Sequence, residues 1–237
     1  MNLKQVIRNI ITFIVYGRHL ISREAYISYM RKLGVRIGDN CYITDPIKCE
    51  LDLTRPWLLE IGDNVCITDN VRVLTHDFSF SVVSRCSMGT YPSMGKVKIG
   101  NNVFVGSHTL ILPHVNIGNN VIIGGGAVVT KDIPDNVVVA GSPARVICTI
   151  DEYANKLKKR ADSNLRELLL EYYKVYGEYP PEKIMTEYYG AFMSYEELTV
   201  KYPNYLKHLV TRKEDVKPKY KNYGDMVRTI LKEEAGF

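Results

Sequence analysis

Aliphatic residues recur every six positions through the middle of this 237-residue chain, and this period constrains the fold more than any other feature. The pattern starts at Ile37, returns at Ile61 and runs without a slip from Ile99 to Val129. A period of six suits neither an amphipathic helix nor a simple alternating strand. It suits a short strand followed by a turn, repeated so that stacked coils bury their aliphatic residues on one another. The sequence therefore predicts a β-solenoid.

Glycine and asparagine mark the positions where each coil is expected to turn. Glycine follows the aliphatic residue at 38, 62, 100, 106, 118 and 124, and Asp-Asn or Asn-Asn pairs come next in several repeats. Both residue types tolerate positive φ, which we expect at tight corners. The aliphatic residues should then point into the solenoid.

The segment 97–147, VKIGNNVFVGSHTLILPHVNIGNNVIIGGGAVVTKDIPDNVVVAGSPARVI, closely resembles the hexapeptide-repeat O-acetyltransferases. Within them it is most similar to the galactoside and maltose acetyltransferase branch and its relatives in polysaccharide biosynthesis. The resemblance implies a mainly β fold, a triangular left-handed parallel β-helix, against the usual right-handed rule. It also implies a homotrimer whose active sites lie between subunits.

Three segments follow from these patterns. Residues 1–34 have helical apolar spacing and should cap the first coil, and residues 35–150 should form the β-helix. The frame breaks between Val73 and Ile99, so residues 78–96 are an excursion loop. Residues 151–237 should be a helical extension, and they hold twelve of the seventeen tyrosines. These tyrosines pack on the solenoid in one interpretation, and line a sugar-binding surface or a protein interface in the other.

His76, at the end of the last in-frame repeat before the excursion, is the predicted general base. Acyl transfer to an alcohol requires a base for the hydroxyl proton, and a neutral imidazole suits that role near pH 7. The family resemblance implies the same role for this position. Asp77 follows where the galactoside and maltose enzymes generally have Pro, which favours an acceptor other than a simple galactoside. Asp77 is also a candidate to orient His76, although adjacent strand residues point to opposite faces.

Five positions match the family's contacts with acetyl-CoA, the donor that the resemblance implies: Ser107, Gly125, Thr130, Lys131 and Arg145. Ser107 is also a candidate catalytic residue, because its N–H or its hydroxyl would stabilise the oxyanion; a plain corner serine is the alternative. Gly125 allows the pantetheine to approach the backbone, and Lys131 and Arg145 suit the phosphates of CoA.

The expected acceptor is a sugar hydroxyl in a surface polysaccharide or in its lipid- or nucleotide-linked precursor. The family's acceptor-contacting Asn falls near Lys48, so no acceptor residue is carried over. Glu50, Asp52 and Trp57 lie in the same irregular stretch, and acceptor contact and a structural role are equally open for them.

Three other functions compete with this one. An acyl carrier protein is an alternative donor, although the ending GSPARV at 141–146 favours CoA. A catalytically silent scaffold would show the same repeats. The γ-class carbonic anhydrases use this solenoid with three histidine ligands, but His108 and His114 differ from those ligands in spacing and repeat position. We therefore predict no metal.

Composition favours a cytoplasmic protein. The chain has five cysteines, an odd number without CxxC spacing, which fits reduced thiols. The apolar run Ile10–Tyr16 is too short to span a bilayer. A net charge of +5 predicts no nucleic-acid partner. Residues 1–36 nevertheless hold seven cations against Glu24 alone. This segment is either a solvated helix face or attracts an acidic sugar, a nucleotide or a membrane surface peripherally.

Overall fold

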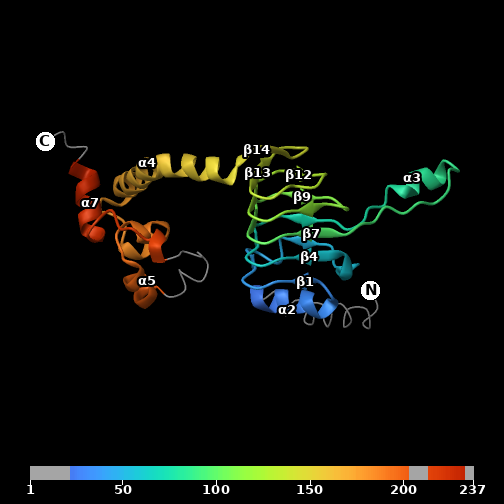
Figure 1. The fold of residues 1–237 in the computed structure, drawn as a ribbon, viewed down its shortest axis with the longest axis horizontal. Coiled ribbons are helices and arrows are strands. Elements are labelled where there is room, and N and C mark those ends of the chain that lie inside the picture. Colours follow the sequence, from blue (N-terminus) through green and yellow to red (C-terminus); the bar gives the residue numbers. More distant parts are fainter. Residues whose placement is uncertain (1–21, 203–212, 233–237) are drawn as a thin grey trace, which may run out of the picture. The chain divides into compact units, whose positions relative to one another are not determined.

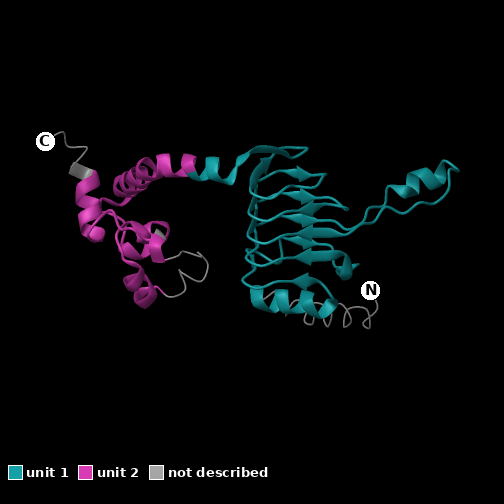
Figure 2. Ribbon diagram, viewed as in Figure 1, with its two compact units in different colours: residues 1–154 teal, residues 155–237 magenta. Residues whose placement is uncertain are grey.

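A computed structural model describes residues 22–202 and 213–232. The chain divides into two compact units, residues 1–154 and residues 155–237, each with its own hydrophobic core (Figures 1 and 2). Helix α4 (Ile150–Tyr176) runs from the first unit into the second. The sequence-based boundary after residue 150 falls at the start of this helix.

The first unit is a solenoid of short strands. These are β1 (Arg36–Ile37), β2 (Tyr42–Ile43), β3 (Glu50–Leu51), β4 (Leu59–Ile61), β5 (Cys66–Ile67), β6 (Arg72–Val73), β7 (Val97–Ile99), β8 (Val103–Val105), β9 (Leu110–Ile111), β10 (Asn116–Ile117), β11 (Val121–Ile123), β12 (Val128–Val129), β13 (Val137–Ala140) and β14 (Arg145–Thr149). Sheet A has the order β1-β4-β7-β10, sheet B β14-β13-β11-β8-β5-β2 and sheet C β12-β9-β6-β3. From β1 to β12, successive strands visit the three sheets in turn and pair in parallel (Figure 1). Strand β13 then pairs in parallel with β11 in sheet B, and β14 closes that sheet antiparallel to β13. The predicted left-handed parallel β-helix is confirmed.

The irregular stretch of the repeat is one enlarged coil. Ile37 pairs directly with Ile61, so the 24 residues that separate them make a single turn of three strands rather than four hexapeptides. The additional residues lie between β2 and β3, and between β3 and β4, where the 3₁₀ helix η2 (Pro56–Leu58) forms. Together they add one period, which is why the six-residue frame survives the insertion.

The A–B corner, where the chain passes from sheet A to sheet B, explains the paired Gly and Asn residues. Positive φ values between 55° and 61° occur at Asn40, Asn64, Asn102, Asn120 and Asn136, as expected for Asn. The glycines of this corner, Gly38, Gly62, Gly100 and Gly118, do not have positive φ. A Cβ on Gly38 would lie 2.2 Å from Oδ1 of Asp63 in the next coil. The expectation of positive φ is therefore wrong for these glycines, which instead allow the coils to approach.

The inward aliphatic residues form the core, and isoleucines such as Ile67, Ile99 and Ile123 are fully buried. Helix α2 (Arg23–Leu33) covers the first coil with Tyr26 and Met30. The expected helical cap thus holds for this part, while residues 1–21 lie outside the described residues.

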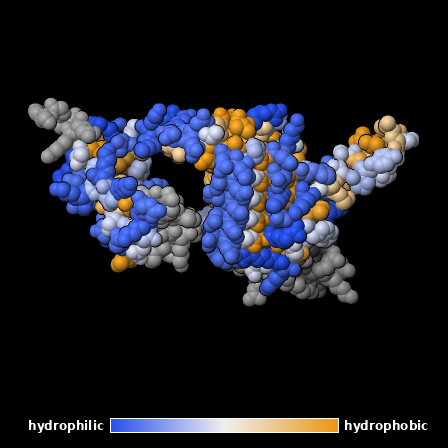
Figure 3. Space-filling view, in the orientation of Figure 1, coloured by the Kyte–Doolittle hydropathy of each residue, from blue (hydrophilic) through white to orange (hydrophobic). Residues whose placement is uncertain are grey.

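The excursion is an arm formed by residues 77–95, which leaves the solenoid at the C–A corner, between sheets C and A (Figure 1). Its root is held by hydrogen bonds from Gly95 N to Thr75 O and from Asp77 N to Ser93 O. It contains the short helix α3 (Phe80–Arg85), in which no residue is buried. Apolar side chains gather at its tip (Figure 3).

The second unit is helical. It consists of α4, η3 (Glu182–Ile184), η4 (Thr186–Ala191), α5 (Tyr195–Lys201), η5 (Lys213–Asp215) and α7 (Tyr223–Lys232). Between α4 and α5 the expected helical extension contains the two 3₁₀ helices η3 and η4 rather than an α-helix. Several tyrosines contribute to this unit's own core; Tyr189 is buried and stacks on Tyr202 with ring centroids 4.1 Å apart. Among the described helices, none carries an apolar stretch long enough to span a bilayer.

Candidate active site

His76 and Asp52 form a close pair at the C–A corner. Asp52 follows β3 and His76 follows β6, and these strands are neighbours in sheet C. Nδ1 of His76 lies 2.5 Å from Oδ2 of Asp52. The Asp52 side chain is only 5% exposed, whereas the imidazole is 31% exposed. The pair therefore has a buried carboxylate and a ring that reaches the surface.

Four hydrogen bonds from two threonines hold the Asp52 carboxylate. Oδ1 accepts from Thr54 N at 3.1 Å and from Thr54 Oγ1 at 2.6 Å. Oδ2 accepts from Thr75 N at 3.1 Å and from Thr75 Oγ1 at 2.5 Å. Burial by itself raises the pKa of Asp52, but these hydrogen bonds outweigh it and hold the pKa far below its ordinary value. Asp52 is therefore ionised at neutral pH.

An ionised Asp52 fixes the tautomer of His76. Because a carboxylate only accepts hydrogen bonds, the short contact requires the imidazole proton on Nδ1. The neutral ring then carries a lone pair on Nε2, which has no partner among residues 22–202 and 213–232. One nitrogen of the ring is thus anchored and the other available, which is the arrangement that a general base requires.

The carboxylate that orients His76 belongs to Asp52 and not to Asp77, its neighbour in the sequence. Asp77 uses Oδ1 to accept from Ser79 N at 2.9 Å and from Ser79 Oγ at 2.5 Å, at the beginning of the arm. Its suggested role in orienting His76 is therefore wrong. The sequence leaves acceptor contact and a structural role open for Asp52 and does not pair it with His76, because the enlarged first coil hides the register between them.

Ser107 and Gly125 lie at a different corner, the B–C corner between sheets B and C. They follow β8 and β11, which are neighbours in sheet B. Gly126 N donates to Ser107 O at 2.8 Å, which stacks the two turns. The Ser107 hydroxyl donates to Thr68 Oγ1 at 3.2 Å, while its N–H has no acceptor among the described residues. The backbone N–H, rather than the hydroxyl, is thus the available donor.

Gly125 and Gly126, which stack on Ser107, are favoured at their positions for two different structural reasons. A Cβ on Gly125 would lie 3.0 Å from Ser107 O, a tight contact that would press on the turn of the coil below. Gly126 has φ +72°, which L-residues rarely adopt. Both keep the backbone of this corner close and free of side chains, as a groove for an extended ligand requires.

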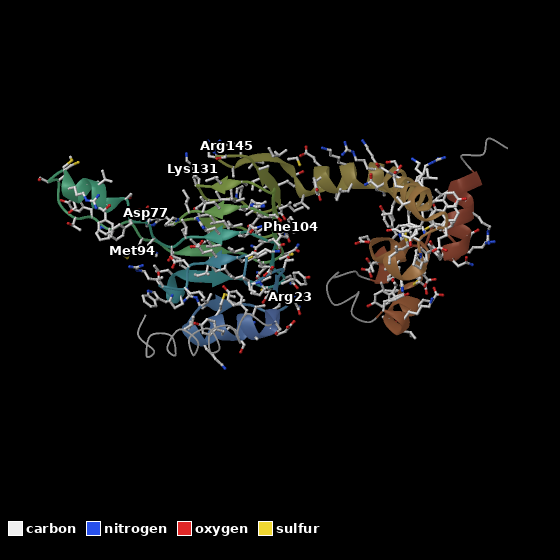
Figure 4. All side chains as sticks on the ribbon, turned by 180° about the vertical axis from the view of Figure 1, so that it is seen from behind. Arg23, Asp77, Met94, Phe104, Lys131 and Arg145 are labelled. Carbon is white, nitrogen blue, oxygen red and sulfur yellow. The ribbon has the colours of Figure 1, made fainter. Side chains whose placement is uncertain are left out.

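The remaining predicted donor contacts divide between the two corners. Thr130 and Lys131 follow β12 at the C–A corner, on the His76 side, and both are exposed. Arg145 is the first residue of β14 and lies opposite Ala140 of β13 in the strand register. It is exposed, next to the B–C corner. Figure 4 shows Lys131 on the same side of the solenoid as Asp77, and Phe104 of sheet B on the opposite side. One chain therefore does not bring all the predicted site residues together.

His108 and His114 are turn residues. Both have positive φ, 62° and 65°, and the ring of His114 packs on Gly95 at the root of the arm. Among the described residues, no three His, Cys, Asp or Glu side chains gather as a metal site would require.

Comparison with known proteins adds the following similarities. The family described as bacterial transferase hexapeptide (six repeats) matches residues 96–131. Protein CapG of Staphylococcus aureus is 40% identical over 146 residues, which cover 60% of this chain and 82% of CapG. Galactoside O-acetyltransferase of Escherichia coli strain K12 is 35% identical over 143 residues, which cover 53% of this chain and 68% of that enzyme. A solved structure of galactoside acetyltransferase in complex with coenzyme A is 28% identical, covers 63% of this chain and 84% of that chain, and has a TM-score of 0.41.

Proposed function

The chain belongs to the hexapeptide-repeat acetyltransferases, and on this basis we propose that it transfers an acetyl group from acetyl-CoA to a hydroxyl of a sugar. The observation that carries the proposal is the pair of His76 and Asp52, 2.5 Å apart, with Nε2 of His76 unpartnered among the described residues. The named activity of the Escherichia coli relative, galactoside O-acetylation, supports a sugar as the acceptor.

In the proposed reaction the acceptor oxygen attacks the thioester carbonyl carbon while Nε2 of His76 takes the hydroxyl proton. The carbon–sulfur bond then breaks, and His76 returns the proton to the sulfur of the departing CoA. The products are an O-acetyl sugar and free CoA, without an acetyl-enzyme. Asp52 stabilises the imidazolium that forms in between, and a base so placed contributes about 10²- to 10⁴-fold in rate.

Ser107 is the proposed donor to the carbonyl oxygen, through its N–H. An N–H held in a rigid turn is directed at developing negative charge without reorganisation, which makes such donors effective. The hydroxyl of Ser107 is already directed to Thr68. Gly125 and Arg145 at the same corner, with Thr130 and Lys131 at the other, are the proposed contacts for the pantetheine and the phosphates.

The division of these residues between two corners supports a homotrimer in which neighbouring copies complete each site. His76, Thr130 and Lys131 of one copy would face Ser107, Gly125 and Arg145 of the next. The outward column of sheet B also favours association, because it is apolar along its length, at Tyr42, Cys66, Phe104 and Ile122. The outward column of sheet A is polar, at Arg36, Glu60, Lys98 and Asn116. Apolar columns of this kind suit subunit contacts.

Two further expectations remain proposals. A cytoplasmic location would supply acetyl-CoA and suits the five free cysteines. Peripheral attraction to a membrane rests on the basic segment 1–36, of which residues 22–36 are described.

Release of free thiol from acetyl-CoA, measured against a panel of sugars, tests the proposed function. We expect release that depends on both the sugar and His76. The matched control is His108→Ala, because His108 lies at the other corner and has no proposed role in proton transfer. Thiol release that needs no acceptor, or that survives in His76→Ala, would contradict the proposal.

A further inference from the structure

The enlarged C–A corner of the first coil places an arginine and a tryptophan beside the His76 pair. Arg55 and Trp57 lie between Asp52 and β4, in and just before η2. Trp57 is 62% exposed and is the one tryptophan of the chain. Pro56 between them is buried and fixes the turn. An indole this exposed contributes little to the core.

Arg55 is half-buried, and its charge has no acidic partner within the described part of the chain. Its Nη1 donates to Thr54 Oγ1 at 3.4 Å, and no carboxylate of the described residues lies within ion-pair distance. Two outward arginines of the strands are paired instead: Arg36 with Glu60 at 3.0 Å and Arg72 with Glu50 at 2.5 Å. A partly desolvated guanidinium without a counter-ion favours the binding of an anion.

Arg55 is connected to His76 by a chain of contacts. Thr54 Oγ1, which accepts from Arg55, donates to Asp52 Oδ1 at 2.6 Å, and Asp52 Oδ2 contacts His76 Nδ1 at 2.5 Å. The guanidinium is thus linked to the imidazole through Thr54 and Asp52, while its own hydrogen bond goes to Thr54 and not to the carboxylate.

Trp57 lies in the first coil, in the turn that leads into β4. Leu59 at the start of β4 pairs with Val97, which follows Gly95 at the root of the arm. Gly95 N bonds to Thr75 O, directly beside His76. The arm and the turn before β4 lie on the same side of the solenoid (Figure 1).

We propose that Arg55 and Trp57 form the acceptor subsite, and that the acceptor is a sugar carrying a negative charge. The sugar ring stacks on the indole, and its carboxylate or phosphate pairs with the guanidinium. The proposal rests on the proposed function and names the acceptor class of that same site. It also gives Trp57, whose role the sequence left open, a binding role.

Intrinsic fluorescence tests this subsite without turnover, because Trp57 is the one indole. The full-length protein is titrated with methyl glucuronide, glucose 1-phosphate and methyl glucoside. We expect saturable changes with the charged sugars and much weaker binding of methyl glucoside. The first two sugars distinguish a carboxylate from a phosphate, and saturation by either one supports the proposal. Equal binding of all three, or no saturable change, overturns it.

Variants of Arg55 identify the charge that is responsible. Arg55→Gln should weaken binding of the charged sugar about tenfold or more and leave methyl glucoside unchanged. Arg55→Lys should recover part of the loss. Arg72→Gln is the matched control, because Arg72 is paired with Glu50 on the outer face of sheet C. An equal effect of Arg55→Gln on charged and neutral sugars overturns the proposal.

Acetyl transfer separates this inference from the proposed function. If charged sugars are acetylated with a KM that rises about tenfold in Arg55→Gln, both stand. If neutral sugars are acetylated equally well and Arg55→Gln changes neither, the subsite is wrong while the acetyltransferase activity holds. If no sugar is acetylated although charged sugars quench Trp57, the subsite stands and the proposed function fails.

Discussion

The carboxylate of Asp52 reaches across from the preceding coil to contact His76, Oδ2 to Nδ1 at 2.5 Å. The two residues are 24 positions apart in sequence and meet because β3 and β6 are neighbours in sheet C. The carboxylate is buried, ionised and held by Thr54 and Thr75, so it orients the imidazole and also sets its tautomer.

Asp52→Asn should lower kcat at least about 100-fold, because an amide neither fixes the Nδ1 proton nor stabilises the imidazolium. The KM for acetyl-CoA should change little, since Asp52 is not one of the proposed donor contacts. Steady-state kinetics with both substrates varied checks this split. Asp77→Asn is the control, because Asp77 contacts Ser79 rather than His76, and it should keep activity within about threefold. Equal losses in the two variants would contradict the role of Asp52.

Asp52 should also make stability depend on pH in the acid range. The pKa of Asp52 is lowered in the folded protein, so the unfolded chain, with an ordinary pKa near 3.9, binds this proton more tightly. The stabilising contribution is therefore fully present above about pH 5 and decreases as the pH falls. Urea unfolding should show the largest difference between wild type and Asp52→Asn near pH 6 and a smaller one near pH 3. A difference that is constant with pH would contradict this expectation.

Ser107→Ala should retain most of the activity, within about threefold in kcat, because the proposed donor is the backbone N–H. The lost hydroxyl contacts only Thr68 Oγ1 among the described residues. Gly125→Val should instead raise the KM for acetyl-CoA, since its side chain enters the B–C corner against Ser107 O. Gly190→Ala controls for loss of a glycine, because nothing lies within 4 Å of the added Cβ. A loss of kcat above about 100-fold in Ser107→Ala would assign the role to the hydroxyl.

Phe104→Asp should weaken the proposed trimer by placing a charge in the apolar column of sheet B. Phe104 is 40% exposed and lies between Cys66 and Ile122 on the outer face. Size-exclusion chromatography with light scattering should show a smaller mass and a parallel loss of activity. Asn116→Asp on the polar face of sheet A is the control and should leave the mass unchanged. A Phe104→Asp protein with unchanged mass and activity would contradict the choice of this face.

The period of six predicts the solenoid because the inward residues are repeated without interruption from Ile99 to Val129. The same period misleads in the first coil, where the insertions at two corners add up to one full period. The frame then appears continuous although the register of sheet C is shifted, with Leu51 opposite Val73. For this reason the sequence identifies His76 but does not pair it with Asp52.

The glycines and the donor contacts show a second limit to what the sequence predicts. The sequence identifies the corners but does not separate positive φ at Asn64 from close approach at Gly62, because both favour small or flexible residues. Similarly, it places Ser107 and Lys131 in one motif although they lie at different corners of the prism. Only the order of strands around the prism separates them.

Thiol release by wild type and His76→Ala, measured with saturating acetyl-CoA and a sugar acceptor, tests the central claim most directly. The variant should lose about 10²- to 10⁴-fold in kcat, because the base acts in the transition state. Its affinity for acetyl-CoA and its unfolding midpoint should match those of wild type. Turnover of His76→Ala within tenfold of wild type would contradict the account of His76 as the general base.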